Sequence, residues 1–368
     1  MKKIKLKLMV SLIIAFLFLP IQEIKGQFYC VGNGCSLLPL DSVELTNAFQ
    51  SLRTQYINEF LSDMSTANIY TMVNTIPSGI VNLQEFTIGI NVILSETKLR
   101  KIDIRVPNYG VIEDVPSKGV GLVPNAFIGF NVGYLFSGDP KPINLKWYSP
   151  HRFDIFVSYL NAVFDDEKAN ATRKNEAWEV KSKTWGADLR YHLIEGNTDT
   201  NWLLGFSGIS LGIGYHNVNQ SIEYVRKNHR FVFNATDKVD VIWRADNEAA
   251  YSSKINVYTI DIRTGIQLLY LFRFSVGVGH AWVKGSSDII FQRFGPVVVE
   301  SDLLKLFGIE PPNANLGLVI NGEGKTKRNQ LTYLSAGFEL NIPLLKIFID
   351  AKGTKDNYSA SAGIRIAL

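Results

Sequence analysis

The histidines, together with the acidic and hydroxyl side chains, are the residues of this chain that most readily carry out acid–base, nucleophilic or metal chemistry. The histidines are His151, His192, His216, His229 and His280. No two of them follow the H-x-x-x-H spacing that places two imidazoles on one helix face. Serine, histidine and aspartate occur somewhere in almost any barrel wall, so their presence alone does not indicate a catalytic triad. We therefore predict no catalytic residue, no metal site and no cofactor, and we expect that the protein is not an enzyme.

Charged residues at alternate positions indicate a different use of polar chemistry. Successive side chains of a strand point to opposite faces, so charges spaced by two share one face. The charged residues on the polar face of the predicted strands are Glu85, Asp188, Arg190, Asp261, Arg263, Glu339, Lys346, Asp350 and Arg365. Inside a barrel, charges of mixed sign either line water or pair into a network that fills the interior. The sequence leaves these two alternatives open.

The strands that must position these charges are clearest in Gln330–Leu368, where apolar residues occupy every second position. The segments run for about 9–11 residues, the length that a tilted strand needs to cross a bilayer. Strands of soluble sandwiches are usually about 5–6 residues long. A closed barrel leaves no strand edge unpaired in lipid. We predict an all-β fold for residues 80–368, a closed antiparallel transmembrane β-barrel of roughly 12–14 strands, since even counts are usual in bacterial barrels.

Residues 1–26 have the composition of a secretory signal peptide, with a lysine-rich start followed by the apolar run Leu8–Leu19. Without them the chain has equal numbers of basic and acidic residues. The basic pI of the whole chain is therefore no evidence for binding of nucleic acid. We predict a bacterial outer-membrane protein whose partners include the membrane lipid.

Cys30 and Cys35 follow the predicted cleavage site closely. An exported compartment is oxidising, which favours a Cys30–Cys35 disulfide. Free thiols, a metal pair and a lipidated Cys30 are the alternatives. Two cysteines alone cannot fill a zinc site, and the residues before Cys30 are bulkier than lipoprotein processing normally needs.

A helix is predicted from Asp41 to about Ser65, because Asp41 and Glu44 form a capping box. Its apolar stripe is Leu45, Phe49, Leu52, Tyr56, Phe60 and Met64, at spacings of three and four. The helix is too polar to span a membrane, so it must pack on the barrel. Residues 27–79 are therefore either a plug in the lumen or a segment at the periplasmic mouth.

The segment Gln220–Ser253 alternates weakly and carries many charges. Charge on a lipid-facing strand is costly, so we predict an extracellular ribbon that rises above the membrane. An even strand count places both termini in the periplasm and the long loops outside the cell. The aromatic residues of the ribbon predicted to bind a ligand are Tyr224, Phe231, Phe233 and Trp243.

The chain resembles outer-membrane barrel proteins of spirochaetes, in particular the leptospiral family of surface-exposed adhesins. The resemblance is carried by the lysine-rich signal, the Cys30–Cys35 opening, the helix before the first strand and the ending Asn357–Leu368. More distantly, the helix resembles the N-terminal plug of fatty-acid transporter barrels. The adhesin resemblance implies display at the cell surface and binding of host matrix or plasma proteins.

Two functions follow from the sequence. The first is a porin-like channel that transports small solutes, which the size of the barrel favours. The second is a surface adhesin that binds host extracellular-matrix or plasma proteins through its loops. The same lipid-facing wall serves both, and the sequence does not determine the solute, the ligand or the oligomeric state.

Overall fold

The computed structural model describes residues 27–37, 42–81, 83, 86–106, 110–137, 146–165, 175–197, 203–236, 239–301 and 313–368. Its strands are β1 (Gln27–Val31), β2 (Phe86–Thr97), β3 (Arg100–Val106), β4 (Gly110–Ser117), β5 (Val120–Asn131), β6 (Phe153–Asp165), β7 (Glu176–Ile194), β8 (Leu204–Thr236), β9 (Val239–Leu268), β10 (Phe272–Ser301), β11 (Ala314–Lys325), β12 (Gln330–Asn341), β13 (Leu345–Gly353) and β14 (Asn357–Ala367). Its helical segments are η1 (Cys35–Leu37), α2 (Ser42–Leu52), η2 (Arg53–Ile57), α3 (Asn58–Val73), α4 (Val132–Ser137) and η3 (Pro150–Arg152).

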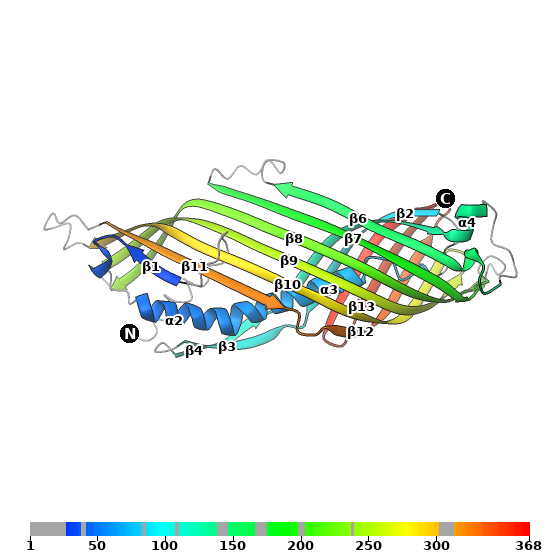
Figure 1. The fold of residues 1–368 in the computed structure, drawn as a ribbon, viewed down its shortest axis with the longest axis horizontal. Helices are drawn as coiled ribbons and strands as arrows, with labels where there is room; N and C mark the ends of the chain where they lie inside the picture. Colours follow the sequence, from blue (N-terminus) through cyan, green and yellow to red (C-terminus); the bar gives the residue numbers. More distant parts are fainter. Residues whose placement is uncertain are drawn as a thin grey trace.

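Ten of the described strands close into a ring by antiparallel pairing (Figure 1). The order is β10-β12-β13-β14-β2-β5-β6-β7-β8-β9, and β9 pairs again with β10. The long strand β10 pairs with β12 over Phe272–Trp282 and with β11 over Ser286–Val297, and β11 carries β1. The predicted antiparallel barrel is confirmed, with fourteen described strands in total.

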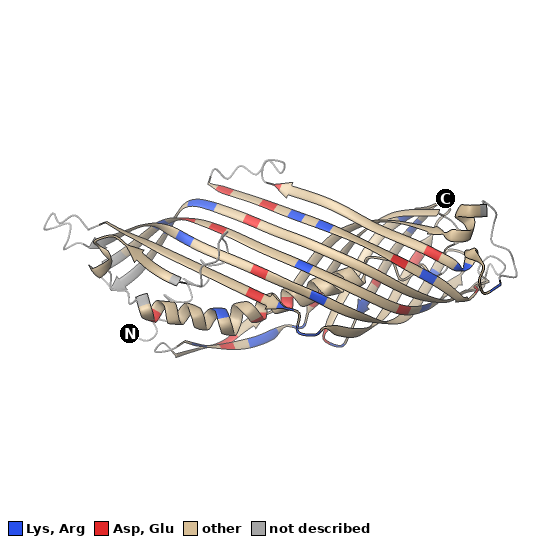
Figure 2. Cartoon of the chain, in the orientation of Figure 1, with Lys and Arg blue, Asp and Glu red and all other residues tan. Residues whose placement is uncertain are grey.

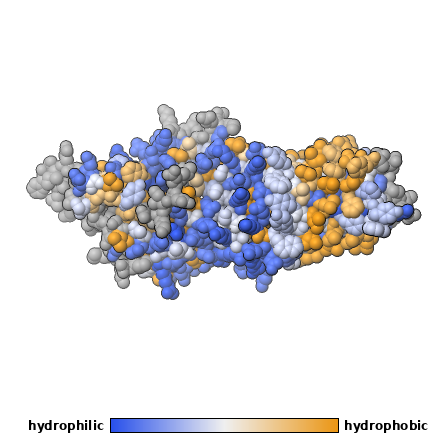
Figure 3. Space-filling view, viewed as in Figure 1, coloured by the Kyte–Doolittle hydropathy of each residue, from blue (hydrophilic) through white to orange (hydrophobic). Residues whose placement is uncertain are grey.

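The alternation of the sequence separates an outer apolar face from an inner polar face. On β2, Ile90 and Val92 are 56% and 49% exposed, whereas Asn91 between them is 3% exposed. Exposed apolar residues on the ring strands gather in a band that crosses one end of the face seen in Figure 3. An apolar outer band with a polar interior is the arrangement of a barrel that faces lipid.

An aromatic row borders this apolar band on five adjacent strands. Its members are Tyr159, Trp185, Tyr215, Tyr258 and Trp282. The ring centroids of Trp185 and Tyr215 are 4.9 Å apart, and those of Tyr215 and Tyr258 are 4.8 Å apart. Tyrosine and tryptophan gather at membrane interfaces because one end of the side chain is apolar and the other is polar.

We call the part beyond this row the extension: β7–β10 on the far side of the row, together with β1 and β11. Residues 220–253 lie in it, as their weak alternation and charge predict. Among the described helices, none combines the length and apolar composition that a membrane-spanning helix requires.

The segments α2, η2 and α3 follow one another without a break from Ser42 to Val73, eight residues beyond the predicted end at Ser65. The π-helical segment η2 shifts the phase of the buried stripe. Leu52 is buried and Tyr56 partly buried, and the stripe then continues five residues later at Leu61 rather than at Phe60. A π-turn inserts one residue into the helix repeat, so the fixed spacing assumed from the sequence fails after Tyr56.

The helix enters the barrel rather than covering its mouth. Nearly all of α3 from Leu61 onwards is buried, and it contacts strands on most sides of the ring, including β2, β5, β8, β9, β10 and β14. The next strand of the ring, β2, begins beside Leu368. Phe86 and Leu368 exchange backbone hydrogen bonds of 3.1 and 2.8 Å. We call this the turn end, and the opposite end, which bears the extension, the loop end.

The first and last described residues lie at opposite ends of the barrel, which differs from the expectation that both termini lie on the periplasmic side. Gln27 pairs with Val319 in the extension, whereas Leu368 lies at the turn end (Figure 1). The reason is that the helix runs lengthwise through the lumen, so the chain enters at one mouth and leaves at the other.

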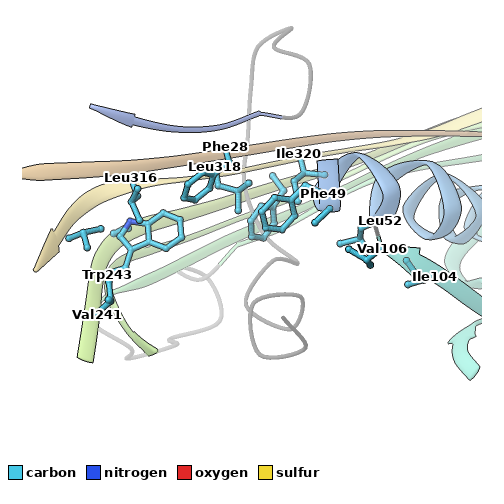
Figure 4. Close-up of a cluster of buried hydrophobic side chains, with 14 residues drawn as sticks. Phe28, Phe49, Leu52, Ile104, Val106, Val241, Trp243, Leu316, Leu318 and Ile320 are labelled. Carbon is cyan, nitrogen blue, oxygen red and sulfur yellow. The ribbon is translucent and has the colours of Figure 1, made fainter. Parts of the chain in front are cut away.

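An apolar core holds the helix in the extension (Figure 4). Phe49 and Leu52 of α2 belong to one cluster with Leu318 and Ile320 of β11 and Trp243 of β9, in which Phe49 lies beside Ile320. Two further apolar clusters lie inside the ring, around α3 and the segment that follows it. Ile69 and Met72 belong to the first, and Ile76 and Ile80 to the second.

Candidate functional site

The lumen is the first candidate site, and its central feature is a buried group of two arginines around one carboxylate. Arg190 Nη2 donates to Asp261 Oδ1 at 2.8 Å, and Arg263 Nη2 donates to Asp261 Oδ2 at 2.7 Å. Arg263 Nη1 also donates to the carbonyl of Pro77 at 2.9 Å. The three charged side chains are between 1% and 5% exposed. This cluster joins the wall to the chain that fills the lumen.

A second group lies nearer the turn end. Arg365 donates to both carboxylate oxygens of Glu339, at 2.9 and 3.0 Å, and Arg273 Nη1 lies 3.4 Å from Glu339 Oε1. Glu339 is fully buried. Bidentate arginine–carboxylate pairs are among the strongest and most directional polar contacts. The charges here are paired with one another across neighbouring strands.

The wall also binds the backbone of the segment that follows α3. Lys352 Nζ donates to the carbonyls of Val73 and Ile76 at 2.8 and 3.2 Å. Asp350 Oδ1 accepts from the amide of Ser78 at 2.9 Å. We call residues 58–81 the plug, because they lead into and fill the lumen and wall side chains bond several of their backbone groups.

Two histidines extend this network. His216 Nδ1 lies 2.9 Å from Thr75 Oγ1, and its Nε2 lies 3.3 Å from Asp188 Oδ2. His192 Nε2 lies 2.6 Å from Asp154 Oδ2, which also accepts from the amide of Leu83. The row Thr75–His216–Asp188 contains the residue types of a catalytic triad. All three residues are at most 6% exposed, so this row gives a substrate no access.

The structure places seven of the nine predicted lumen residues on the buried inner face: Asp188, Arg190, Asp261, Arg263, Glu339, Asp350 and Arg365. Lys346 is half-buried at the start of β13, and Glu85 lies outside the described residues. Sequence reasoning missed Asp154, His192, His216, Arg273 and Lys352, which belong to the same network. The signal was available for Lys352, because it is two residues from Asp350 and shares its face.

The second candidate site is the ribbon, where two of the predicted aromatic residues, Phe231 and Trp243, pack against the interior of the extension. Trp243 is 3% exposed, and Phe231 packs partly buried against the same core. Tyr224 is half-buried opposite the buried Ala249, and the side chain of Phe233 lies outside the described residues. The prediction of an exposed aromatic surface is therefore wrong for Trp243.

The reason is a cationic centre inside the extension. The guanidinium of Arg293 lies 4.6 Å from the ring centroid of Trp243 and 5.8 Å from that of Phe231. It donates to the carbonyls of His229 and Trp243 at 2.9 and 2.8 Å. Burial lowers the pKa of Arg293 to about 10, so it stays protonated at neutral pH. Aromatic faces attract such a cation, which turns Trp243 and Phe231 inward.

A salt-bridge cluster, which we call the clasp, fastens the plug at the loop end. Arg100 of β3 pairs with Glu59 and Asp63 of α3, and Lys327 Nζ lies 2.6 Å from Glu59. Ser117 Oγ donates to Asp63 Oδ2 at 2.6 Å. The hydrogen bond from Lys327 holds the pKa of Glu59 below its usual value, and Arg100 acts in the same direction. A cavity of about 400 Å³ lies beside this clasp.

Cys30 and Cys35 form a disulfide in the structure. It joins β1 to η1, next to the strand pairing that fixes β1 on β11. Figure 2 shows the charged residues distributed along the strands of both the ring and the extension.

Comparison with solved structures gives outer-membrane proteins. The outer membrane protease OmpT of Escherichia coli is 10% identical, with 77% of this chain and 97% of that chain covered and a TM-score of 0.36. The translocator domain of the autotransporter NalP from Neisseria meningitidis is 10% identical, with 78% and 90% covered and a TM-score of 0.30. A FadL homologue of Pseudomonas aeruginosa is 7% identical, with 82% and 97% covered and a TM-score of 0.24.

No curated protein matches the chain. The family model described as Lsa36-like matches residues 23–368, which is almost the whole sequence and includes the plug, the ring and the extension. This match agrees with the resemblance to leptospiral surface proteins drawn from the opening and the ending of the chain. The chain, an outer-membrane type of β-barrel, belongs to the Lsa36-like family.

Proposed function

We propose that this protein is a plugged barrel of the bacterial outer membrane that works as a surface adhesin. In this proposal the extension lies outside the cell and binds host extracellular-matrix or plasma proteins. The length of β8–β10, which carry the extension beyond the loop end, supports this orientation. Barrels of this class have short periplasmic turns and longer extracellular parts.

The filled lumen is the observation that carries the proposal. Ala67 and Met72 of α3 are fully buried inside the ring, and the wall charges bind the plug or one another. A pore that conducts ions needs a wet path lined by polar groups. Here the polar groups that would line it are used to hold the plug, which favours display over transport.

The test locks the plug to the wall. Ser65 Oγ and Ser287 Oγ are 2.8 Å apart, close enough for cysteines at both positions to form a disulfide. We expect the oxidised Ser65→Cys/Ser287→Cys protein to bind a panel of matrix and plasma proteins as the wild type does, with no single-channel conductance in planar bilayers. Loss of binding on locking, with the barrel still folded, would contradict the adhesin.

A gated channel for small solutes is the second candidate, and the polar surface of α3 favours it. Asn68 Nδ2 donates to Ser253 Oγ at 3.1 Å, and Ser65 bonds to Ser287. Exchanging such hydrogen bonds for bonds to water has a small net cost, about 0.5–1.5 kcal/mol each. A gated channel predicts conductance in the reduced double-cysteine protein that disappears on oxidation. Wild-type protein under the same redox conditions controls for the Cys30–Cys35 disulfide.

A catalytic role is not part of the proposal. The hydroxyl–histidine–carboxylate row Thr75–His216–Asp188 is buried where the plug meets the wall. Hydrolysis assays on the same preparations would detect any activity.

A further inference from the structure

A basic concavity lies on the extension, away from the lumen and its plug. It has a volume of about 540 Å³ and is lined by Asn175, Glu176, Arg226, Lys227, Asn228, His229 and Arg230. We call Arg226, Lys227, His229 and Arg230 of β8, with Arg244 of β9, the basic bulge. The name reflects the register of β8, which shifts between Arg226 and His229 so that two residues oppose one on β9. Such bulges re-aim side chains away from the regular sheet.

The charges of the basic bulge are only partly compensated. Asp246 Oδ1, opposite the bulge, accepts from the amide of Asn228 at 2.7 Å. Arg226 Nε lies 3.2 Å from Glu176 Oε1. Within the part of the chain that the structure describes, no acidic group forms an ion pair with Lys227, Arg230 or Arg244. Arg230 and Arg244 are directly opposite each other across β8 and β9, and both are exposed. Like charges in such a cross-strand pair destabilise the sheet, so folding alone does not account for this arrangement.

The interior adds to the positive field of the bulge. Arg293 lies directly beneath it, with Nη1 3.2 Å from His229 Nδ1 and Nη2 bonded to the carbonyl of His229. Burial lowers the pKa of His229, and the charges of Arg226 and Arg293 lower it further. Arg293 therefore adds to the positive electrostatic potential that an anionic ligand meets at the outer surface of the bulge.

The chemistry of the bulge suits a chain of sulfate and carboxylate groups. Arginine forks bind such oxyanions bidentately, and lysine binds them as a point charge. Phe231 and Trp243, on the same two strands as the bulge, face inward against Arg293. These two rings therefore offer no stacking face to a nucleic-acid base and no apolar anchor to a protein partner.

The position of the bulge separates it from the lipid surface. Arg226 follows Tyr215 of the aromatic row by about 35 Å along β8, at about 3.3 Å per residue. Phosphates of the outer leaflet lie at the level of the row, so they do not reach the bulge without a long saccharide. A soluble or matrix-bound polyanion does.

We propose that the basic bulge binds a sulfated polysaccharide of the host matrix, a glycosaminoglycan, through Arg226, Lys227, Arg230 and Arg244. This inference rests on the proposed surface location and names a ligand class for the same extension. Binding by exposed charges weakens as salt increases.

Heparin serves as the probe, immobilised on a sensor surface, with full-length refolded protein in detergent. The test variant is Lys227→Glu/Arg230→Glu/Arg244→Glu. The control variant Lys183→Glu/Lys254→Glu/Lys284→Glu makes the same charge change at exposed positions nearer the aromatic row. We expect the test variant to lose affinity by about tenfold or more and the control by about twofold or less. Slower migration of boiled protein on gels checks that both barrels are folded.

Three outcomes would overturn the inference: equal losses in both variants, equal binding of desulfated heparin, or binding of purified lipopolysaccharide in place of heparin through the same residues. The last would assign the bulge to the cell's own surface. Failure of the proposed function is distinguishable, because conductance and binding of matrix proteins are measured on the same two variants. Heparin binding by a protein that conducts ions and binds no matrix or plasma protein would leave the bulge assignment standing and remove the adhesin.

Discussion

Lys352, in the barrel wall, donates from Nζ to the backbone carbonyl of Val73 at the end of α3, at 2.8 Å. The lysine is 2% exposed and also reaches the carbonyl of Ile76. A wall side chain thus satisfies carbonyl groups that the end of a helix leaves without partners. The plug ends inside the ring because the wall provides these donors.

Lys352→Met should weaken the attachment of the plug. The substitution leaves two buried carbonyls without a donor, at about 1–3 kcal/mol for each unsatisfied group. We expect a lower midpoint in urea unfolding of the refolded barrel. Lys183→Met, at an exposed wall position, is the control and should leave the midpoint unchanged. Equal midpoints for the two variants would show that Lys352 does not hold the plug.

Neighbouring residues on β9 test the two faces of the wall. Ile262→Arg places a charge on the lipid face, at about 2–4 kcal/mol near the midplane. Arg263→Ile removes one arginine from Asp261 and the donor to Pro77, and breaking a buried pair costs about 3–5 kcal/mol. We expect refolding yields to fall at least as much for Arg263→Ile. Ile262→Leu is the control, and a normal yield for Arg263→Ile would contradict the network.

Trp243→Ala should loosen the extension and spare the ring. The substitution removes a large side chain from the apolar core and a ring face from Arg293, at about 3–5 kcal/mol for a buried aromatic residue. Limited proteolysis should then cut the extension faster, while boiled and unboiled protein still migrate differently on gels. Trp147→Ala, at a 76% exposed position, should be cut at the wild-type rate.

The clasp of Glu59 should open in acid. The pKa of Glu59 is lowered in the folded protein, so its contribution is present above the ordinary carboxyl value of about 4.3. It is lost as the pH falls through the lowered value, because the protonated group no longer pairs with Lys327. The protection of amides in α3 near Glu59 against hydrogen exchange, taken relative to the unstructured rate at the same pH, should fall below about pH 4.3 in the wild type. Glu59→Gln should exchange faster at neutral pH and change less with pH.

A replacement of the whole ribbon is a poorer experiment than these point substitutions. Val241, Trp243 and Ala245 of β9 belong to the core against which α2 packs. Removing residues 221–246 would therefore expose this core and disturb the helix, so a loss of binding could not be assigned to the surface.

The sequence by itself determined which residues of the barrel wall face outward and which face the lumen. Whether Ile90 or Asn91 faces lipid depends only on the two-residue repeat of a strand, a local property. The same repeat placed Asp261 and Arg263 on the inner face. The start of the helix was also predicted from local residues, and α2 begins at Ser42, while the predicted cap Asp41 lies outside the described residues.

Only the tertiary structure decided what fills the barrel. The plug lies in the lumen because Lys352, Asp350 and Arg263, distant in sequence, converge on its backbone. The π-turn at Arg53–Ile57 changed the face that α3 buries. Trp243 turned inward because Arg293, fifty residues later, lies against its ring. Such pairings depend on strand register and on the shape of a closed interior, which no local pattern of residues encodes.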